Sequence, residues 1–163
     1  MPCWARSPPR STGSATHPEW APRKMINQLL AGVHIAAAAE AMALGIRTGA
    51  DPQVLYDVIS NSAGSSWMFQ NRVPHIIAGD YTPLSAVNIF VKDLGIVLDS
   101  ARKMTFPLPL TAAAHQMFLG AAGAGLGYED DSAVVKVYQA LSGIELPGKK
   151  QVRGKRQRAK GKR

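Results

Sequence analysis

The chain has 163 residues, one cysteine and a formal net charge of +8. This length suffices for one domain with a hydrophobic core and is short for two. The single cysteine, Cys3, excludes an intramolecular disulfide and a cysteine-based zinc site. The four histidines are too scattered to form a ligand motif, so we expect no metal site.

The positive charge lies at the two ends of the chain. Nine Lys or Arg and no acidic residue lie between Lys149 and Arg163, whereas residues 24–148 contain seven basic and ten acidic residues. The tail over residues 148–163 is too poor in apolar side chains to order itself, and we expect it to be disordered. Nucleic-acid binding would therefore come from this tail alone and would be non-specific.

Residues 1–23 contain five prolines and show neither the helical nor the strand period. We expect a disordered or foreign leader without the apolar segment of a signal peptide. A membrane span is not expected either, because His34 and Glu40 interrupt the longest apolar run, which we judge too short to cross a bilayer. Together with the single cysteine, these features predict a cytoplasmic protein.

A long helix is expected from Lys24 to about Gly49, where the sequence contains no proline. Its apolar residues are distributed all round the helix, which predicts burial by neighbours on every side. Lys24, Asn27 and Gln28 are spaced i, i+3 and i+4, so they share one face and form a candidate reaction site. The alternative is that Lys24 is an ordinary solvated side chain.

Further helices are expected along the rest of the body. Asp51 and Pro52 predict the start of a helix over 52–60, and Ser65 or Ser66 can cap a short helix. Pro74 is expected to interrupt or open the next turn. Helices over 85–103, 108–119 and about 132–142 follow, the first capped by Ser85 and the last by Asp130 or Asp131. The fold class is therefore all-α, a bundle of about six helices around the long one.

Three further features remain open to interpretation. Lys92 interrupts an apolar stretch and is either a functional cation or half of a surface ion pair with Asp93. Glu40 requires a partner from another helix if it is buried. The glycines from Gly123 to Gly127 have the wrong spacing and context for a dinucleotide-binding loop, and we read them as a connection between helices.

Four stretches of residues 24–146 resemble the C-terminal helical domain of the β-hydroxyacid dehydrogenases, which include 3-hydroxyisobutyrate, tartronate semialdehyde and threonate dehydrogenases. They are KMINQLLAGVHIAAAAEAMALGIRTGADPQVLYDVI, the helix with Trp-Met-Phe, VKDLGIVLDSARKMTFPLPLTAAAHQMF and GLGYEDDSAVVKVYQ. The first is most similar to the threonate dehydrogenase version. The resemblance implies a helical domain like the C-terminal domain of 6-phosphogluconate dehydrogenase over residues 24–147, which binds substrate and forms homo-oligomers.

The resemblance also implies roles for the candidate residues. Lys24 matches the lysine that acts on the substrate hydroxyl, and Gln28, with Asn27 before it, matches an amide that holds the substrate. Lys92 matches a lysine that reaches the cofactor, NAD or NADP. A lysine with its pKa lowered by apolar surroundings can take the hydroxyl proton while hydride leaves for a nicotinamide. The substrate would be a small hydroxy acid of the threonate or 3-hydroxyisobutyrate type.

The sequence departs from the family in one important respect. Family members carry an N-terminal Rossmann domain with G-x-G-x-x-G, and these 163 residues contain no such segment. We therefore expect a truncated enzyme that is inactive alone. The alternatives are a helical dimerisation or interaction module without catalysis and a non-specific nucleic-acid-binding protein that uses its tail.

Overall fold

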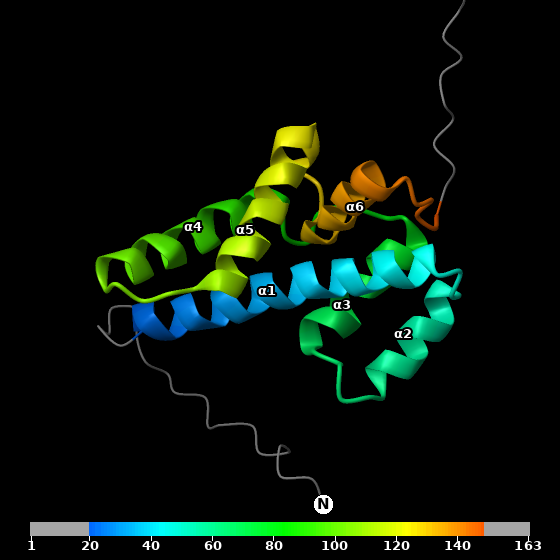
Figure 1. Cartoon of the computed structure of the whole chain (residues 1–163), viewed down its shortest axis with the longest axis horizontal. Coiled ribbons are helices and arrows are strands. Elements are labelled where there is room, and N and C mark those ends of the chain that lie inside the picture. The colour runs from blue at the N-terminus through cyan, green and yellow to red at the C-terminus, as the bar shows by residue number, and fades with distance from the viewer. Residues whose placement is uncertain (1–19, 149–163) are drawn as a thin grey trace, which may run out of the picture.

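A computed structural model describes residues 20–148 of the chain (Figure 1). Most of the predicted leader over residues 1–23 and of the predicted basic tail over residues 148–163 lies outside the described residues. Within them, six α-helices form the body and no strand is present, although Ala86 and Asp130 form an isolated antiparallel bridge. The all-α prediction is confirmed for this part of the chain.

The six helices follow one another with short connections. They are α1 (Trp20–Arg47), α2 (Pro52–Ser60), α3 (Trp67–Ala78), α4 (Val87–Lys103), α5 (Pro109–Ala121) and α6 (Val135–Ser142). A π-helical turn, Ala122–Leu126, extends α5, and a 3₁₀ helix, Asp131–Val134, leads into α6. The number of helices therefore agrees with the prediction.

Helix α1 is the central element and contacts each of the other five helices (Figure 1). Its middle is buried by these neighbours, with Ile35, Ala39 and Met42 at most 1% exposed. The expectation of burial on every side is wrong, however, because Ile26 is 52% exposed and Leu44 is 64% exposed. The apolar residues go all round α1, but its neighbours cover one side of it and leave apolar surface at both ends.

By length and mean hydropathy, the Pro22–Arg47 part of α1 could cross a membrane, so our judgement that the apolar run is too short was wrong. The mean hydropathy of its most apolar window is 1.8 despite His34 and Glu40. A core helix of a soluble protein meets the same criterion. The contacts of α1 with the surrounding helices give its buried residues a partner within the chain.

Most helix caps are those that the sequence predicts. The Asp51 carboxylate accepts hydrogen bonds from the backbone N–H groups of α2, and the Ser66 hydroxyl accepts one from the first turn of α3. The Asp130 carboxylate caps the 3₁₀ helix before α6. Helix α3 ends at Gly79, which has a left-handed φ of 63° that glycine adopts without strain.

Several details of the helices differ from the prediction. Helix α1 begins at Trp20, four residues before Lys24. Helix α4 begins after Ala86, which has no side chain to act as a cap, rather than at Ser85. Pro74 lies inside α3, on its exposed side, where the helix continues although proline lacks an N–H group.

Helices α1 and α4 pack closely where they cross. A Cβ atom added to Gly32 would lie 2.9 Å from both methyl carbons of Leu94 and 3.0 Å from the ring of Phe90. Phe90 in turn stacks on Phe118 of α5, with 5.2 Å between the ring centroids. The absence of a side chain at Gly32 thus allows α4 to lie directly against α1 in the core.

A buried charged cluster joins α3 to the segment before α6. Arg72 Nε donates to Asp131 Oδ1 at 2.5 Å, and its Nη2 donates to Asp131 Oδ2 at 3.1 Å. Burial raises the pKa of Asp131, and the hydrogen bond and charge of Arg72 oppose that rise. Next to it, Asp130 accepts a hydrogen bond from Leu84 N at 3.1 Å and donates one from its own N–H to Tyr81 O at 2.9 Å. These bonds fix the loop between α3 and α4.

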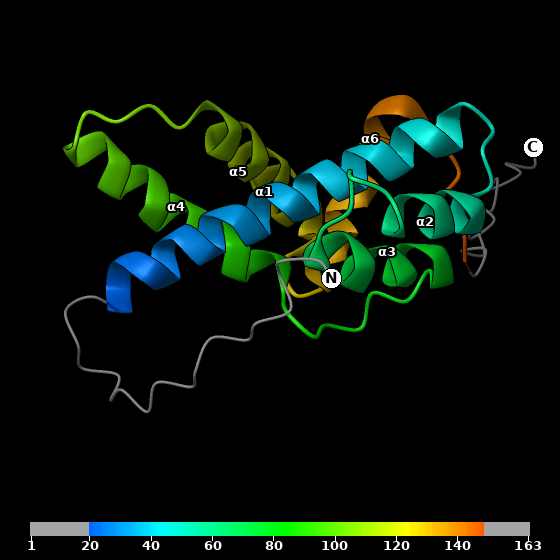
Figure 2. The same ribbon diagram turned by 90° about the horizontal axis from the view of Figure 1, so that it is seen from below.

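Away from this cluster, the helices diverge. Figure 2 shows α1 and α4 crossing, with the N-terminal part of α1 and the C-terminal part of α4 pointing away from each other. The side chains left exposed there include several large apolar ones, namely Ile26, Leu30, Ile96, Met104 and Phe106. We call this region, residues 20–31 and 95–110, the open end, and we call the region around Arg72, Asp130 and Asp131 the closed end.

Candidate active site

The structure brings three of the four predicted site residues into one polar cluster. Gln28 Nε2 donates to Asp93 Oδ2 at 2.8 Å, although the two residues lie 65 positions apart in the chain. Asp93 Oδ1 lies 3.3 Å from the Nζ atom of Lys92. Asn27 Nδ2 donates to Gln28 Oε1 at 3.3 Å and so joins the same cluster from the side of α1.

The packing of α1 on α4 explains why this cluster forms. Gly32 of α1 lies against Leu94 and Phe90 of α4, and Gln28 lies one turn before Gly32. The residue before Leu94, Asp93, is therefore within reach of Gln28 beside the buried contact. The Asp93 side chain is 16% exposed, so the cluster lies at the edge of the core.

Lys24 lies in α1 one turn before Gln28, on the face that the i, i+4 spacing predicts. Its side chain is exposed, and the described residues do not give it the apolar surroundings that we expected for a general base. The helix α1 has neighbours over its middle and its C-terminal half, but Lys24 lies in the open end. If Lys24 becomes buried, the covering surface must come from outside the described residues.

Lys92 makes the ion pair that the structural alternative predicted, with Asp93 as its partner. The Lys92 side chain remains 68% exposed. A surface pair of this kind contributes little to stability, typically below about 1 kcal/mol. The pair therefore leaves the ammonium accessible to a ligand.

Asp93 is the residue of this cluster that sequence reasoning missed. The sequence indicates Asp93 as a neighbour of Lys92 but gives no indication of its contact with Gln28. The sequence did contain a sign of this role, since Lys92 and Asp93 form a charged pair within an apolar helix. Adjacent side chains point about 100° apart, so one of the two lies closer to the core than the other. Identifying Gln28 as its partner required the crossing of α1 and α4.

The glycines from Gly123 to Gly127 form a helix connection, as predicted. They belong to the π-helical turn after α5, where Gly125 has a φ of 86°. A Cβ atom at Gly127 would lie 2.6 Å from the amide nitrogen of Asn88 in α4, so a side chain there would require the exposed Asn88 side chain to move. The run follows a helix rather than a strand, so it lacks the setting in which such glycines approach a pyrophosphate.

Glu40 has the interhelical partner that we could not name from the sequence. The Tyr138 hydroxyl of α6 donates to Glu40 Oε2 at 2.7 Å. Burial, together with the hydrogen bond to Glu40 and its charge, raises the pKa of Tyr138. Glu40 itself is exposed rather than buried, so this pair is a structural link between α1 and α6.

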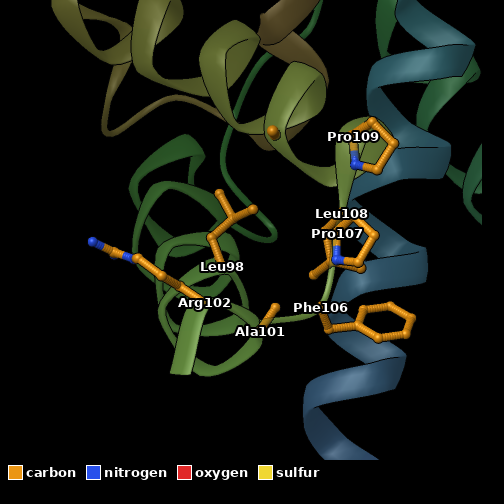
Figure 3. Close-up of a pocket in the computed structure, with 8 residues that line it drawn as sticks. Leu98, Ala101, Arg102, Phe106, Pro107, Leu108 and Pro109 are labelled. Atoms are coloured by element: carbon orange, nitrogen blue, oxygen red, sulfur yellow. The ribbon is translucent and has the colours of Figure 1, made fainter. Parts of the chain in front are cut away.

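An apolar cavity of about 560 Å³ lies between the end of α4 and the start of α5 (Figure 3). None of the polar cluster lines it; its lining residues are Leu98, Ala101, Arg102, Phe106, Pro107, Leu108, Pro109 and Ala112. Arg102, the one charged residue of the lining, forms an ion pair with Asp99. This cavity therefore lacks the convergent polar groups that a hydroxy acid or a cofactor needs.

The described residues fit part of a nicotinamide cofactor site. The exposed ammonium of Lys92 can bind an anionic or carbonyl oxygen of a ligand. The cluster contains no series of backbone N–H groups at the start of a helix, which is the usual means of binding a pyrophosphate. No three His, Cys, Asp or Glu side chains between residues 20 and 148 lie close enough to hold a metal ion.

Comparison with known proteins gives a consistent family. The family model described as "NAD-binding of NADP-dependent 3-hydroxyisobutyrate dehydrogenase" matches residues 22–138. The chain is 71% identical over 135 residues to L-threonate dehydrogenase of Cupriavidus necator, covering 83% of this chain and 44% of the relative. It is 61% identical over 127 residues to L-threonate dehydrogenase of Escherichia coli K12, covering 78% and 41% of the two chains.

Solved structures show the same fold. The crystal structure of 3-hydroxyisobutyrate dehydrogenase from Salmonella typhimurium is 61% identical, with a TM-score of 0.71, and the match covers 72% of this chain and 41% of that one. Mycobacterium tuberculosis 3-hydroxyisobutyrate dehydrogenase with L-serine is 26% identical, with a TM-score of 0.65, covering 71% and 42%. The present chain thus spans less than half the length of these relatives.

Proposed function

The chain belongs to the family of the NAD-binding region of NADP-dependent 3-hydroxyisobutyrate dehydrogenase, and we propose that residues 24–147 act as the helical substrate domain of a hydroxyacid dehydrogenase. The cofactor would be NAD or NADP. The likeness to L-threonate dehydrogenases supports a threonate-type acid as the substrate, and 3-hydroxyisobutyrate is the alternative. A cytoplasmic location remains a prediction from the sequence.

The observation that carries this proposal is the link between the two helices. Asp93 contacts both Gln28, the candidate substrate residue, and Lys92, the candidate cofactor residue. These residues come from α1 and α4 and are adjacent only because the helices cross. A dehydrogenase requires its substrate and its cofactor to be held next to each other, since hydride passes directly between them.

The proposed chemistry assigns one task to each side chain. Lys24 takes the proton of the substrate hydroxyl during oxidation and returns it during reduction. Asn27 and Gln28 orient the substrate without adding charge, and Lys92 binds the cofactor. A bound nicotinamide would supply the acceptor for the hydride. Because Lys24 is exposed in the described residues, a second domain must cover it to exclude water from the reaction.

This second domain would be a nucleotide-binding domain, either elsewhere in the same protein or in another chain. The described residues supply half of the site and should not turn over substrate by themselves. Measuring NAD- or NADP-linked oxidation of L-threonate by the purified 163-residue chain tests this point. Substantial turnover would contradict the claim that another domain is needed.

The role of Lys24 is tested by joining the chain to the nucleotide-binding domain of the Cupriavidus necator relative. We expect threonate oxidation, and Lys24→Ala should lower it about 10²- to 10⁴-fold, the usual contribution of a general base. Lys103→Ala, which removes another exposed lysine at the end of α4, is the matched control and should leave the rate unchanged. Activity that survives Lys24→Ala would exclude Lys24 as the base.

A second candidate function is an interaction module that forms homo-oligomers. The exposed apolar side chains of the open end favour it, because Ile96 is 54% exposed, Met104 is 64% exposed and Phe106 is 61% exposed. Sedimentation of the wild-type chain and of Phe106→Ser would test it, and a monomeric wild-type chain would contradict it. Non-specific nucleic-acid binding by residues 149–163 stays a prediction, which deletion of that segment and a salt titration would test.

A further inference from the structure

The side chains of Asp93, Gln28 and Asn27 form a chain of hydrogen bonds with a defined direction. Asp93 Oδ2 accepts from Gln28 Nε2 at 2.8 Å, and Gln28 Oε1 accepts from Asn27 Nδ2 at 3.3 Å. A carboxylate can only accept hydrogen bonds, so it determines which end of the Gln28 amide faces it. We call these three side chains the amide relay.

The direction of the relay determines what it presents at its far end. An isolated glutamine or asparagine can offer either its carbonyl oxygen or its amide group to a ligand, depending on how the amide is turned. In the relay, the Gln28 nitrogen faces Asp93, and the Gln28 oxygen therefore faces the Asn27 nitrogen. Among residues 20–148, the Asn27 carbonyl oxygen is left as the free acceptor, and the aligned amide dipoles strengthen it.

The geometry points to Asp93 as a positioning residue that orients both amides, so that Asn27 presents its carbonyl oxygen to a hydroxyl group of the substrate. This inference rests on the proposed function and names a substrate class for the same site. Asp93 would act through Gln28 and need not touch the substrate. Its second oxygen, 3.3 Å from Lys92 Nζ, also holds the candidate cofactor residue next to the relay.

A free carbonyl acceptor favours a polyhydroxy acid over an acid with an alkyl branch. L-Threonate has hydroxyl groups on the carbons between its carboxylate and its terminal hydroxyl, whereas 3-hydroxyisobutyrate has a methyl group there. A methyl group facing the Asn27 oxygen would displace water without replacing its hydrogen bond. We expect the site to prefer the polyhydroxy acid on the order of tenfold, the effect of one such bond.

The relay can be tested without any ligand, by NMR of the ¹⁵N-labelled full chain. The side-chain NH₂ signals of Asn27 and Gln28 are assigned from Asn27→Ala and Gln28→Ala. We expect Asp93→Ala to shift both sets of signals and to speed their exchange with water. Asn27 does not contact Asp93 directly, so the response of its signals reports the relay rather than the loss of a neighbour.

Two variants make this test specific. Asp93→Asn keeps an oxygen acceptor for Gln28 and loses the charge opposite Lys92, so it should restore most of the wild-type amide signals. Asp99→Ala removes another aspartate of α4 that pairs with Arg102 instead, and it should leave the signals of both amides unchanged. The remaining backbone signals show whether each variant is folded, and Asp93→Leu, which also removes both acceptor oxygens, decides the question if Asp93→Ala is not.

Unchanged Asn27 signals in Asp93→Ala would overturn the relay, as would equal effects of Asp93→Ala and Asp99→Ala. The substrate class is tested by titrating the labelled wild-type chain with L-threonate and with 3-hydroxyisobutyrate. L-Threonate should shift the Asn27 signals at a concentration on the order of tenfold lower, and Asp93→Ala should remove this difference. Equal responses to the two acids would overturn the preference and leave the proposed function intact. No response to either acid would contradict the proposed function and the preference, while the ligand-free spectra would still decide the relay.

Discussion

The closed end and the open end of the molecule use charged residues in opposite ways. At the closed end, Arg72 and Asp131 pair with side chains that are 9% and 0% exposed, and their hydrogen bonds join segments that are distant in the chain. At the open end Lys24 is exposed, and just before its α4 part Lys92 is 68% exposed although it has a partner. The charged groups of the closed end are bonded within the chain, whereas Lys24 and Lys92 remain accessible to a ligand or to another protein surface.

This difference indicates that stability and chemistry are separated within one small bundle. The closed end is buried and fully connected, so its charges contribute to the folded structure and are inaccessible to ligands. The open end keeps several apolar and charged side chains exposed, and a substrate, a cofactor or another protein surface can still bind there. The amide relay lies at the inner edge of the open end, where α1 crosses α4. Variants at the closed end should therefore affect mainly stability, and variants at the open end should affect mainly the binding of a ligand or of another protein surface.

The largest expected effect is at the closed end. Asp131→Ala leaves Arg72 with a buried charge and no counter-ion, and we expect it to lower the free energy of unfolding by about 3–5 kcal/mol. The matched control is Asp99→Ala, because Asp99 pairs with Arg102 while both side chains are more than 60% exposed (62% and 77%). It should cost less than about 1 kcal/mol. Urea unfolding measures the free energy of unfolding of both variants. Similar losses would show that the buried pair and the exposed pair contribute equally to stability.

An intermediate effect is expected at the crossing of α1 and α4. Gly32→Ala places a methyl group within 3.0 Å of Leu94 and Phe90, which should cost about 1–3 kcal/mol, while the higher helix propensity of alanine returns about 1 kcal/mol. We expect a net loss of up to about 2 kcal/mol, and a weaker hydrogen bond between Gln28 and Asp93.

Gly120→Ala in α5 is the control, since its Cβ atom would meet Val137 at an ordinary 3.7 Å. It should stabilise the chain by up to about 1 kcal/mol. Thermal unfolding of Gly32→Ala and Gly120→Ala measures the difference in stability between the two variants. Stabilisation by both substitutions would mean that the crossing can widen without loss, contrary to close packing at Gly32.

The smallest effect is expected at Tyr81, beside the closed end. Its buried hydroxyl has no hydrogen-bond partner within residues 20–148, and burial, followed by the charge of Glu129, raises its pKa from 10.0 to about 12. Because the unfolded tyrosine ionises first, folding stability should fall as pH rises from about 10 through 12. Tyr81→Phe should reduce this fall and change stability at pH 7 by less than about 1 kcal/mol. Urea unfolding at pH 7, 10 and 11 measures it, and an unchanged pH dependence would contradict the assignment.

The sequence predicted the parts of the fold that depend on local interactions. Asp51, Ser66 and Asp130 each cap a helix through a bond to a backbone N–H group two or three residues on. The sequence identified Asp51 directly and narrowed each of the other two caps to a pair of adjacent residues. The residue type at Lys24, Asn27 and Gln28 and their spacing also predicted one face of α1. The family resemblance added Lys92, which local reasoning left undecided.

The remaining features depend on contacts between distant segments. The exposure of Ile26 and Leu44 follows from where the neighbouring helices end, which the periodicity of α1 does not contain. Pro74 within α3 is tolerated because its side of the helix faces solvent. The role of Asp93 depends on the packing at Gly32, which brings α4 against α1. Its hydrogen bond to Gln28 spans 65 positions of the chain and cannot be inferred from local sequence.

The unbroken length of α1 beyond Gly32 has a mechanical consequence. The α-carbon of Lys24 lies eight residues from Gly32, about 12 Å along the helix axis, and that of Gln28 lies about 6 Å away. A helix is stiff over this distance, so a tilt of α1 about its contact with Leu94 would move the N-terminal part of the helix as a rigid body. Tilting it by about 10° would move Lys24 by about 2 Å and Gln28 by about 1 Å. A protein surface that presses on the N-terminal part of α1 could thereby set the distance between the proposed base on α1 and Asp93 and Lys92 on α4.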